Sequence, residues 1–108
     1  MKFEIGENKL EKVIFKYLTT KNFVIKETNK NYYFLGSEGD DHAEIRVRKD
    51  DMVCYVSHDL CKEVKSFFSF DVPDSQYFIK RYVETILNIE ISNVFFPIGY
   101  RIPVIGVN

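Results

Sequence analysis

The residues best suited to chemistry in this 108-residue chain are its two histidines and the acidic residues close to them. His42 follows two aspartates, and His58 stands directly before a third. Imidazole and carboxylate groups together can act as general acid and base, or can ligate a divalent metal. Their spacing matches no known catalytic or metal-binding motif, so their use depends on whether the fold brings them together. The candidate set is Glu38, Asp40, Asp41, His42, His58 and Asp59.

A predicted β-hairpin brings most of this set to one place. Residues Ala43–Lys49 alternate apolar and charged side chains, which is typical of a strand with one face in a core and the other in water. Met52–Ser57 forms the next strand, and Asp50-Asp51 is the short turn between them. In the register that this turn sets, His42 faces Asp59 across the hairpin. We therefore expect both histidines and their acidic neighbours at the end of the sheet opposite the turn.

The remaining segments predict the elements that surround this hairpin. A short edge strand, a helix capped by Asn8 and two further strands precede it, and two helices and a last strand follow it. This order, β-α-β-β-β-β-α-α-β, separates runs of strands from runs of helices, which is typical of an α+β fold. We expect an antiparallel sheet of four to six strands with the helices packed on one face. The expected strands outside the hairpin are Lys2–Ile5, Phe23–Thr28, Tyr32–Leu35 and Ile89–Phe96, and the first helix is Lys9–Lys21. The second helix contains Leu60–Phe68 and is capped by Ser57 or Asp59, and the third is capped by Asp71, carries an apolar stripe from Phe78 to Leu87 and stops at Asn88.

Length and composition indicate one folded domain over residues 1–108. With 45% hydrophobic and 29% charged residues, the chain has enough apolar surface to offset the entropy lost on folding. Neither a signal peptide nor a run of about 20 apolar residues occurs in the sequence, so we expect a cytoplasmic protein without membrane association. Residues 97–108 read as an extended apolar tail, which needs a covering surface. That surface is either the domain's own core or a second copy of the chain, so a homo-oligomer formed through this tail is one option.

A basic, aromatic strand face suggests a different chemistry. Arg46 and Arg48 occupy the solvent face of their strand, and with Tyr32 or Tyr33 on a neighbouring strand they could bind single-stranded nucleic acid. The net charge of −1 provides no general attraction to nucleic acid, however. A solvated strand face with cross-strand charge pairs explains the same pattern.

The two cysteines, Cys54 and Cys61, match neither a disulfide framework nor a paired zinc motif. We interpret them as small, packed hydrophobic side chains in a reducing compartment. Nothing in the sequence indicates a lowered thiol pKa for either residue.

Recognisable enzyme motifs are absent from the sequence, which has no Gly-rich phosphate loop, no Gly-x-Ser-x-Gly and no His-Glu-x-x-His. We therefore expect a protein-binding module without catalytic residues or a cofactor, and favour a toxin-neutralising immunity or antitoxin-type inhibitor. Its acidic candidate set would bind a basic toxin domain such as a nuclease, because complementary charge speeds encounter and occupies the phosphate-binding site. Two alternatives stay open. One is a small metal-dependent enzyme that uses His42, His58 and the nearby aspartates, and the other is a nucleic-acid-binding domain that uses Arg46 and Arg48.

Overall fold

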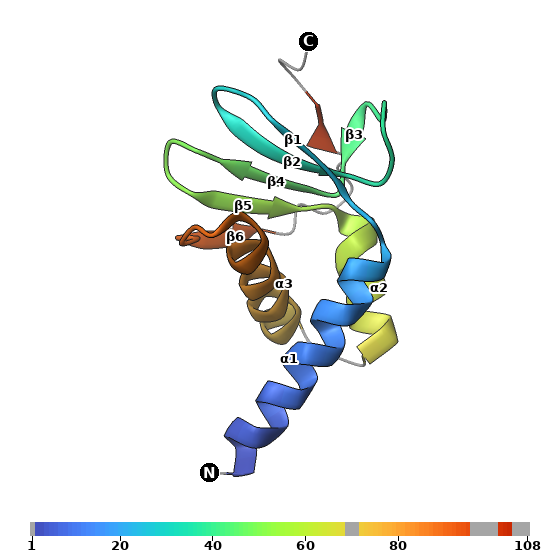
Figure 1. Cartoon of the computed structure of the whole chain (residues 1–108), viewed down its shortest axis with the longest axis vertical. Coiled ribbons are helices and arrows are strands. Elements are labelled where there is room, and N and C mark those ends of the chain that lie inside the picture. Colours follow the sequence, from blue (N-terminus) through green and yellow to red (C-terminus); the bar gives the residue numbers. More distant parts are fainter. Residues whose placement is uncertain (1, 69–71, 96–101, 105–108) are drawn as a thin grey trace.

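The computed structural model describes residues 2–68, 72–95 and 102–104. These residues form three helices and seven short strands, joined by turns and loops (Figure 1). Runs of strands and runs of helices are segregated along the chain, as predicted for an α+β fold. In chain order the elements are α1 (Lys2–Thr20), β1 (Val24–Glu27), β2 (Asn31–Leu35), β3 (His42–Ala43), β4 (Ile45–Arg48), β5 (Val53–Val56), α2 (His58–Phe68), α3 (Val72–Leu87), β6 (Asn93–Phe95) and β7 (Ile102–Pro103).

The main sheet has five strands in the order β1-β2-β4-β5-β6. Its neighbours pair antiparallel from β1 to β5, which confirms the predicted antiparallel arrangement for most of the sheet. The pairing of β5 with β6 is parallel and corrects that prediction. Parallel strands need a long crossover between them, and α2 and α3 together form this connection. The short strands β3 and β7 form a separate two-stranded sheet.

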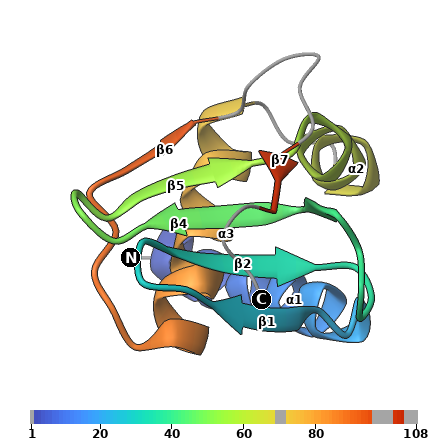
Figure 2. The ribbon, with the colours of Figure 1, turned by 90° about the horizontal axis from the view of Figure 1, so that it is seen from above.

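Helices α1 and α3 lie behind the five-stranded sheet when it is seen from above, and α2 stands at the end of β5 (Figure 2). The predicted alternation of β4 is confirmed, because Ile45 and Val47 are fully buried while Arg46 and Arg48 are only partly so. Of the predicted apolar stripe of α3, Phe78, Ile79, Tyr82 and Val83 face this core, whereas Ile86 is exposed. The main core consists of Ile14, Leu18, Phe34, Ile45, Val47, Cys54, Val56, Leu60, Val64, Phe78, Ile79, Tyr82, Val83, Ile91 and Val94.

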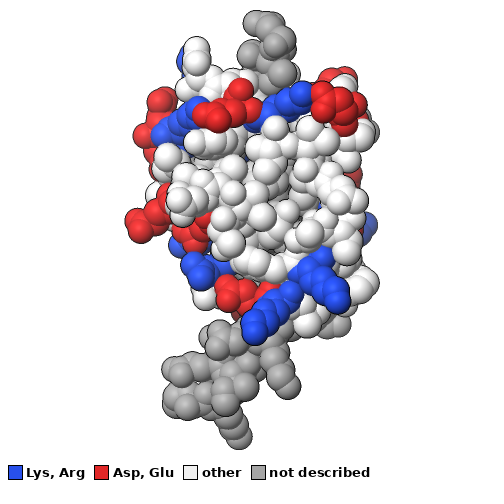
Figure 3. Space-filling model, in the orientation of Figure 1, with Lys and Arg blue, Asp and Glu red and all other residues white. Residues whose placement is uncertain are grey.

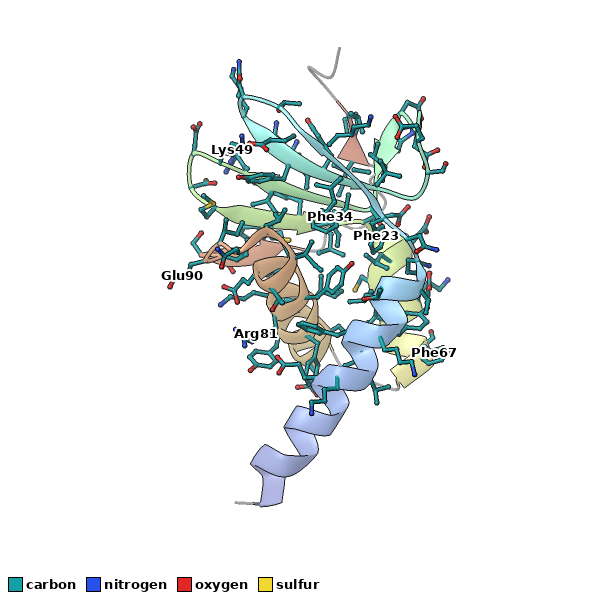
Figure 4. All side chains as sticks on the ribbon, in the orientation of Figure 1. Phe23, Phe34, Lys49, Phe67, Arg81 and Glu90 are labelled. Carbon is teal, nitrogen blue, oxygen red and sulfur yellow. The ribbon has the colours of Figure 1, made fainter. Side chains whose placement is uncertain are left out.

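Aromatic rings connect the helices to the sheet within this core. The ring of Phe34 on β2 lies 5.9 Å from that of Phe23 and 6.2 Å from that of Tyr82 on α3, measured between centroids (Figure 4). On α1, Phe15 meets Tyr82 edge to face at 5.7 Å. Edge-to-face and tilted contacts of this length are favourable aromatic geometries, so these rings fix how α1 and α3 sit against the strands.

The opposite face of the sheet carries a smaller core. Tyr33, Leu35, Ala43 and Ile102 are buried together there. The run Tyr32–Leu35 lacks alternation because β2 is covered on both faces, by the helices on one side and by the β3–β7 sheet on the other. Ile102 belongs to the predicted apolar tail and is 4% exposed, so this part of the tail is covered by the chain's own core. The rest of that predicted segment, residues 97–101 and 105–108, lies outside the described residues.

The prediction of an edge strand at Lys2–Ile5 is wrong, since α1 already begins at Lys2. Asn8, the predicted helix cap, therefore lies inside α1. Four residues of alternation are too few to distinguish a strand from one turn of a helix, and an interior glycine such as Gly6 costs a helix only about 1 kcal/mol. The helix ends at Thr20, and Asn22 then adopts a positive φ of 53°, which redirects the chain into β1. Among the described helices, none combines the length and apolarity needed to cross a membrane.

Candidate partner-binding site

The hairpin of β4 and β5 has the register that the sequence predicts. Val47 pairs with Cys54, and the turn between the strands includes Met52 at a positive φ of 55°. At the far end, the N–H of Ser57 donates to the carbonyl of Glu44 over 2.8 Å. The chain then turns into α2, so the paired strands end at Ile45 and Val56, three positions short of the predicted pair of His42 and Asp59.

His42 does not face Asp59 across this hairpin, which corrects the predicted pairing. The strand bends at Glu44, and His42 and Ala43 form the separate strand β3, opposite Pro103 and Ile102 of β7. The physical reason is burial: Ala43 and Ile102 close the small core on the outer sheet face, which a straight continuation of β4 would leave exposed.

Several of the predicted site residues nevertheless gather around one pocket of about 250 Å³. In Figure 3, acidic side chains gather over the connection between β2 and β3. We name the acidic group at this pocket the acidic corner, and it consists of Asp40, Asp41, Glu44 and Asp59. The remaining described lining residues are His42, Ala43 and Ser57, so none of the lysines or arginines that the structure describes lines the pocket.

The loop before β3 is held by its own hydrogen bonds. Asp40 accepts one from the N–H of Ser37 at 3.0 Å and one from the Ser37 hydroxyl at 2.9 Å. Gly39 adopts a φ of +87°, a conformation that side chains disfavour, and this allows the tight return of the chain. The Asp41 carbonyl accepts the N–H of Val104 at 3.0 Å, so β7 fixes the loop from the other side.

Two predicted members lie outside the pocket lining. Glu38 instead forms an ion pair with Lys26, with 2.6 Å between Oε1 and Nζ, and its side chain is 70% exposed. His58 is the first residue of α2 and is not among the lining residues. The pocket therefore includes His42 but not His58, and does not bring the two histidines together as the sequence predicts.

Glu44 and Ser57 complete the pocket and were missed because strand periodicity assigns them only to a solvent face and a strand end. The Ser57 hydroxyl donates to Oε1 of Glu44 at 2.8 Å and accepts the N–H of Leu60 at 3.1 Å. Ser57 is thus the N-cap of α2, one of the two caps that the sequence offers. The signal that could have found Glu44 was its position opposite Ser57 in the predicted register.

The imidazole of His42 contacts one carboxylate. Its Nδ1 lies 2.7 Å from Oδ1 of Asp41, whose side chain is 91% exposed. Exposed pairs of this kind contribute little to stability. No hydrogen bond joins His42 to Ser57 within the described part of the chain, and the Ser57 hydroxyl is already engaged by Glu44 and α2. The described lining residues therefore include no nucleophile that is paired with an imidazole base.

The described side chains do not form a set of ligands for a metal ion. Across residues 2–68, 72–95 and 102–104, no three His, Cys, Asp or Glu side chains are placed to hold one ion together. What the acidic corner offers is an open, negatively charged pocket that favours a cationic group.

The basic strand face is organised around a different tyrosine from the two predicted. Tyr33 is fully buried, whereas the guanidinium carbon of Arg46 lies 4.6 Å from the centroid of the Tyr55 ring. On the other side of Tyr55, the Phe95 ring stacks at 5.8 Å with an interplanar angle of 28°. The Tyr55 ring is therefore already in contact with a guanidinium and a second ring, and it lies on β5 rather than on β2, where the sequence places the tyrosines of the predicted platform.

Both cysteines are buried and free. Burial raises the pKa of the Cys54 thiol to about 12 and also raises that of Cys61, although Lys65 partly opposes the second shift. A raised pKa removes the reactive thiolate, so neither residue offers thiol chemistry to the pocket.

Comparison with known proteins adds no relative to these observations. A scan against protein-family models, a search of curated proteins and a search of solved structures each gave no match. The function proposed below therefore rests on the geometry and charge of the acidic corner.

Proposed function

We propose that this chain is a protein-binding module of the toxin-neutralising, immunity or antitoxin type, and that it binds a basic surface of its partner at the acidic corner. The observation that carries the proposal is the convergence of Asp40, Asp41, Glu44 and Asp59 on one pocket, with no lysine or arginine among its described lining residues. The module acts in the cytoplasm and performs no catalysis.

Electrostatics favours a basic partner at this place. Like charges that converge on one pocket repel one another, and a cationic partner relieves that repulsion on binding. Complementary charge also speeds diffusional encounter and disfavours wrong partners. A nuclease needs a basic surface to hold phosphate groups, and an acidic inhibitor occupies that surface directly.

Pocket size favours a side chain over a small-molecule ligand. The volume of about 250 Å³ lies below the ~300–1,000 Å³ that is typical of small-molecule and cofactor sites. The pocket is also polar, whereas such sites are mostly apolar. The head group of a lysine or arginine presented by the partner suits both its size and its charge.

The corner is built in advance of binding, which lowers the entropy lost on association. Ser57 joins Glu44 to the first turn of α2, and the hydrogen bond from Val104 fixes the main chain at Asp41. The carboxylates therefore sit on elements that are already fixed by the fold.

The experiment compares two variants that each remove two negative charges. Asp41→Ala with Asp59→Ala changes the corner at exposed side chains, and spares Asp40 because that residue holds Ser37. Asp50→Ala with Glu90→Ala is the matched control, and Glu90 lies on the opposite side of the molecule from β3 (Figure 4). Each tagged variant is expressed in the native cell, and the co-purified partner is then tested in a direct binding assay over a range of salt.

We expect the corner variant to bind the partner more weakly and with a shallower salt dependence, while the control variant keeps both properties. Equal affinity and an equal salt slope for the corner variant would place the interface elsewhere. Failure of the unaltered protein to retain any stable protein partner would also count against the proposal.

A further inference from the structure

A row of side chains crosses the outer face of the sheet next to the acidic corner. The registers of the five strands place them opposite one another in the order Lys26, Tyr33, Arg46, Tyr55 and Phe95. Directly opposed residues share one face of a sheet, and this face is the one turned away from the main core. Because side chains alternate along a strand, Glu44 of the corner and Arg46 also share this face.

Arg46 is held in position by the rings beside it. Its guanidinium stacks on Tyr55, which in turn stacks on Phe95, and the Phe95 side chain remains 47% exposed on the edge strand β6. A guanidinium placed on an aromatic face loses little further freedom when it binds a carboxylate. Arginine and aromatic residues in such arrangements are also the types enriched at the centres of protein interfaces.

Arg46 differs from the other cations of these strands because it has no acidic partner among the described residues. Its Nε is buried without a hydrogen-bond acceptor, and it forms no ion pair with any residue in the described part of the chain. A buried donor without an acceptor is rare in a native fold and calls for an explanation. The neighbouring cations are all paired, as Lys26 with Glu38, Arg48 with Asp51 and Lys49 with Glu27.

We propose that Arg46 binds a carboxylate of the same partner protein whose basic side chain enters the acidic corner, an inference that rests on the function proposed above. Glu44 directly precedes β4 and still pairs through main-chain hydrogen bonds with Phe34 and Ser57, so it lies about 7 Å from Arg46 along the extended chain. Residues i and i+2 of an extended partner segment have the same spacing on one face. In this proposal the recognised segment is extended and parallel to β4, so that it carries a basic residue, any residue and then an acidic residue.

The test uses isotopically labelled protein and three synthetic peptides followed by NMR. Between flanking serines the peptides carry Lys-Thr-Glu, Lys-Thr-Gln or Gln-Thr-Gln, so that the charges are added one at a time. We expect Lys-Thr-Gln to bind at the corner more tightly than Gln-Thr-Gln. Lys-Thr-Glu should bind about five-fold more tightly again, which corresponds to the upper range for an exposed ion pair.

Arg46→Gln should abolish the advantage of Lys-Thr-Glu over Lys-Thr-Gln. Arg48→Gln is the matched control, because Arg48 lies on the same strand face but is already paired with Asp51, and it should keep the advantage. If Arg46→Gln does not fold, Arg46→Lys keeps the charge without the planar fork and should reduce the advantage.

The outcomes separate this inference from the function on which it rests. Equal binding of Lys-Thr-Glu and Lys-Thr-Gln to the unaltered protein, or an advantage that survives Arg46→Gln, overturns the role of Arg46 alone. Equal binding of Lys-Thr-Gln and Gln-Thr-Gln instead overturns the acidic corner as a site for basic side chains, and the present inference with it.

Discussion

Two isoleucines on α3 allow a direct test of how this helix is oriented. Ile79 is fully buried in the main core, whereas Ile86, seven residues later on the same helix, is 44% exposed. Replacing each by alanine removes the same atoms and changes helix propensity by the same amount. The difference between the two variants therefore measures packing alone.

The expected magnitude follows from the burial of each side chain. Removing a fully buried isoleucine side chain loses about 1.5–3 kcal/mol of transfer free energy and adds a cavity term of about 24 cal/mol per Å³. We therefore expect Ile79→Ala to lower the free energy of unfolding by about 3–4 kcal/mol. Ile86→Ala loses about half of the transfer free energy and leaves no closed cavity, so we expect a loss of about 1 kcal/mol.

Urea denaturation followed by circular dichroism measures both variants. With a slope of about 1–3 kcal/mol per M for a small protein, the transition midpoint of Ile79→Ala should lie about 1–2 M below that of Ile86→Ala. Ile79→Asp buries an unpaired carboxylate in the same place, and we expect it to yield no folded protein. Coincident midpoints for the two alanine variants would refute the packing of α3 against the sheet.

Two further predictions concern thiol reactivity and pH dependence. In native protein at pH 8, a thiol reagent should label neither Cys54 nor Cys61 at the rate of a free thiol, because burial raises the pKa of both thiols. Both cysteines should react after unfolding. Fast labelling of the native protein would show that these sites are open to solvent. Burial alone would raise the pKa of Glu63, but hydrogen bonds from Lys21 and Tyr17 outweigh it and the pKa lies below its ordinary value of 4.5. The Glu63 carboxylate therefore stabilises the fold above pH 4.5, and this contribution is lost as the pH falls through the lowered pKa. Glu63→Gln should flatten the acid limb of a profile of unfolding free energy against pH. An unchanged acid limb would contradict this role of Glu63.

The hairpin and the last helix could be predicted because each has a strong local pattern. Alternation fixes which face of a strand is buried, and a short turn leaves one register that keeps this face intact, so the pairing of Val47 with Cys54 follows from the sequence. The stripe on α3 repeats at helical spacing over several turns, and Asn88, the predicted stop, adopts a positive φ of 54°.

Elements that depend on distant contacts were not predictable in this way. The bend at Glu44 that creates β3 exists because Ile102 covers Ala43, and no local pattern connects these two residues. The parallel pairing of β6 depends on where α2 and α3 return the chain, which periodicity does not specify.

The candidate site was predicted in part for the same reason. Asp40, Asp41, His42 and Asp59 meet because the hairpin register brings their segments to one end of the sheet. Glu44 was missed because its role depends on Ser57, and Ser57 acts as a helix cap rather than as the end of a strand. Glu38 was included by proximity in the sequence alone, and its pairing with Lys26 on β1 takes it elsewhere.

The pairing of β3 with β7 has a consequence for the order in which the protein acquires its surface during synthesis. β7 is the last described element of the chain, and it holds the segment that carries Asp41 and His42. Contacts between segments so distant in sequence carry a high loop-closure entropy and form late. A nascent chain can complete the hairpin of β4 and β5 early, but the loop that carries Asp41 is fixed only after the ribosome has released β7. The loop that carries Asp41 therefore reaches its final position only when nearly the whole described chain has been synthesised and folded.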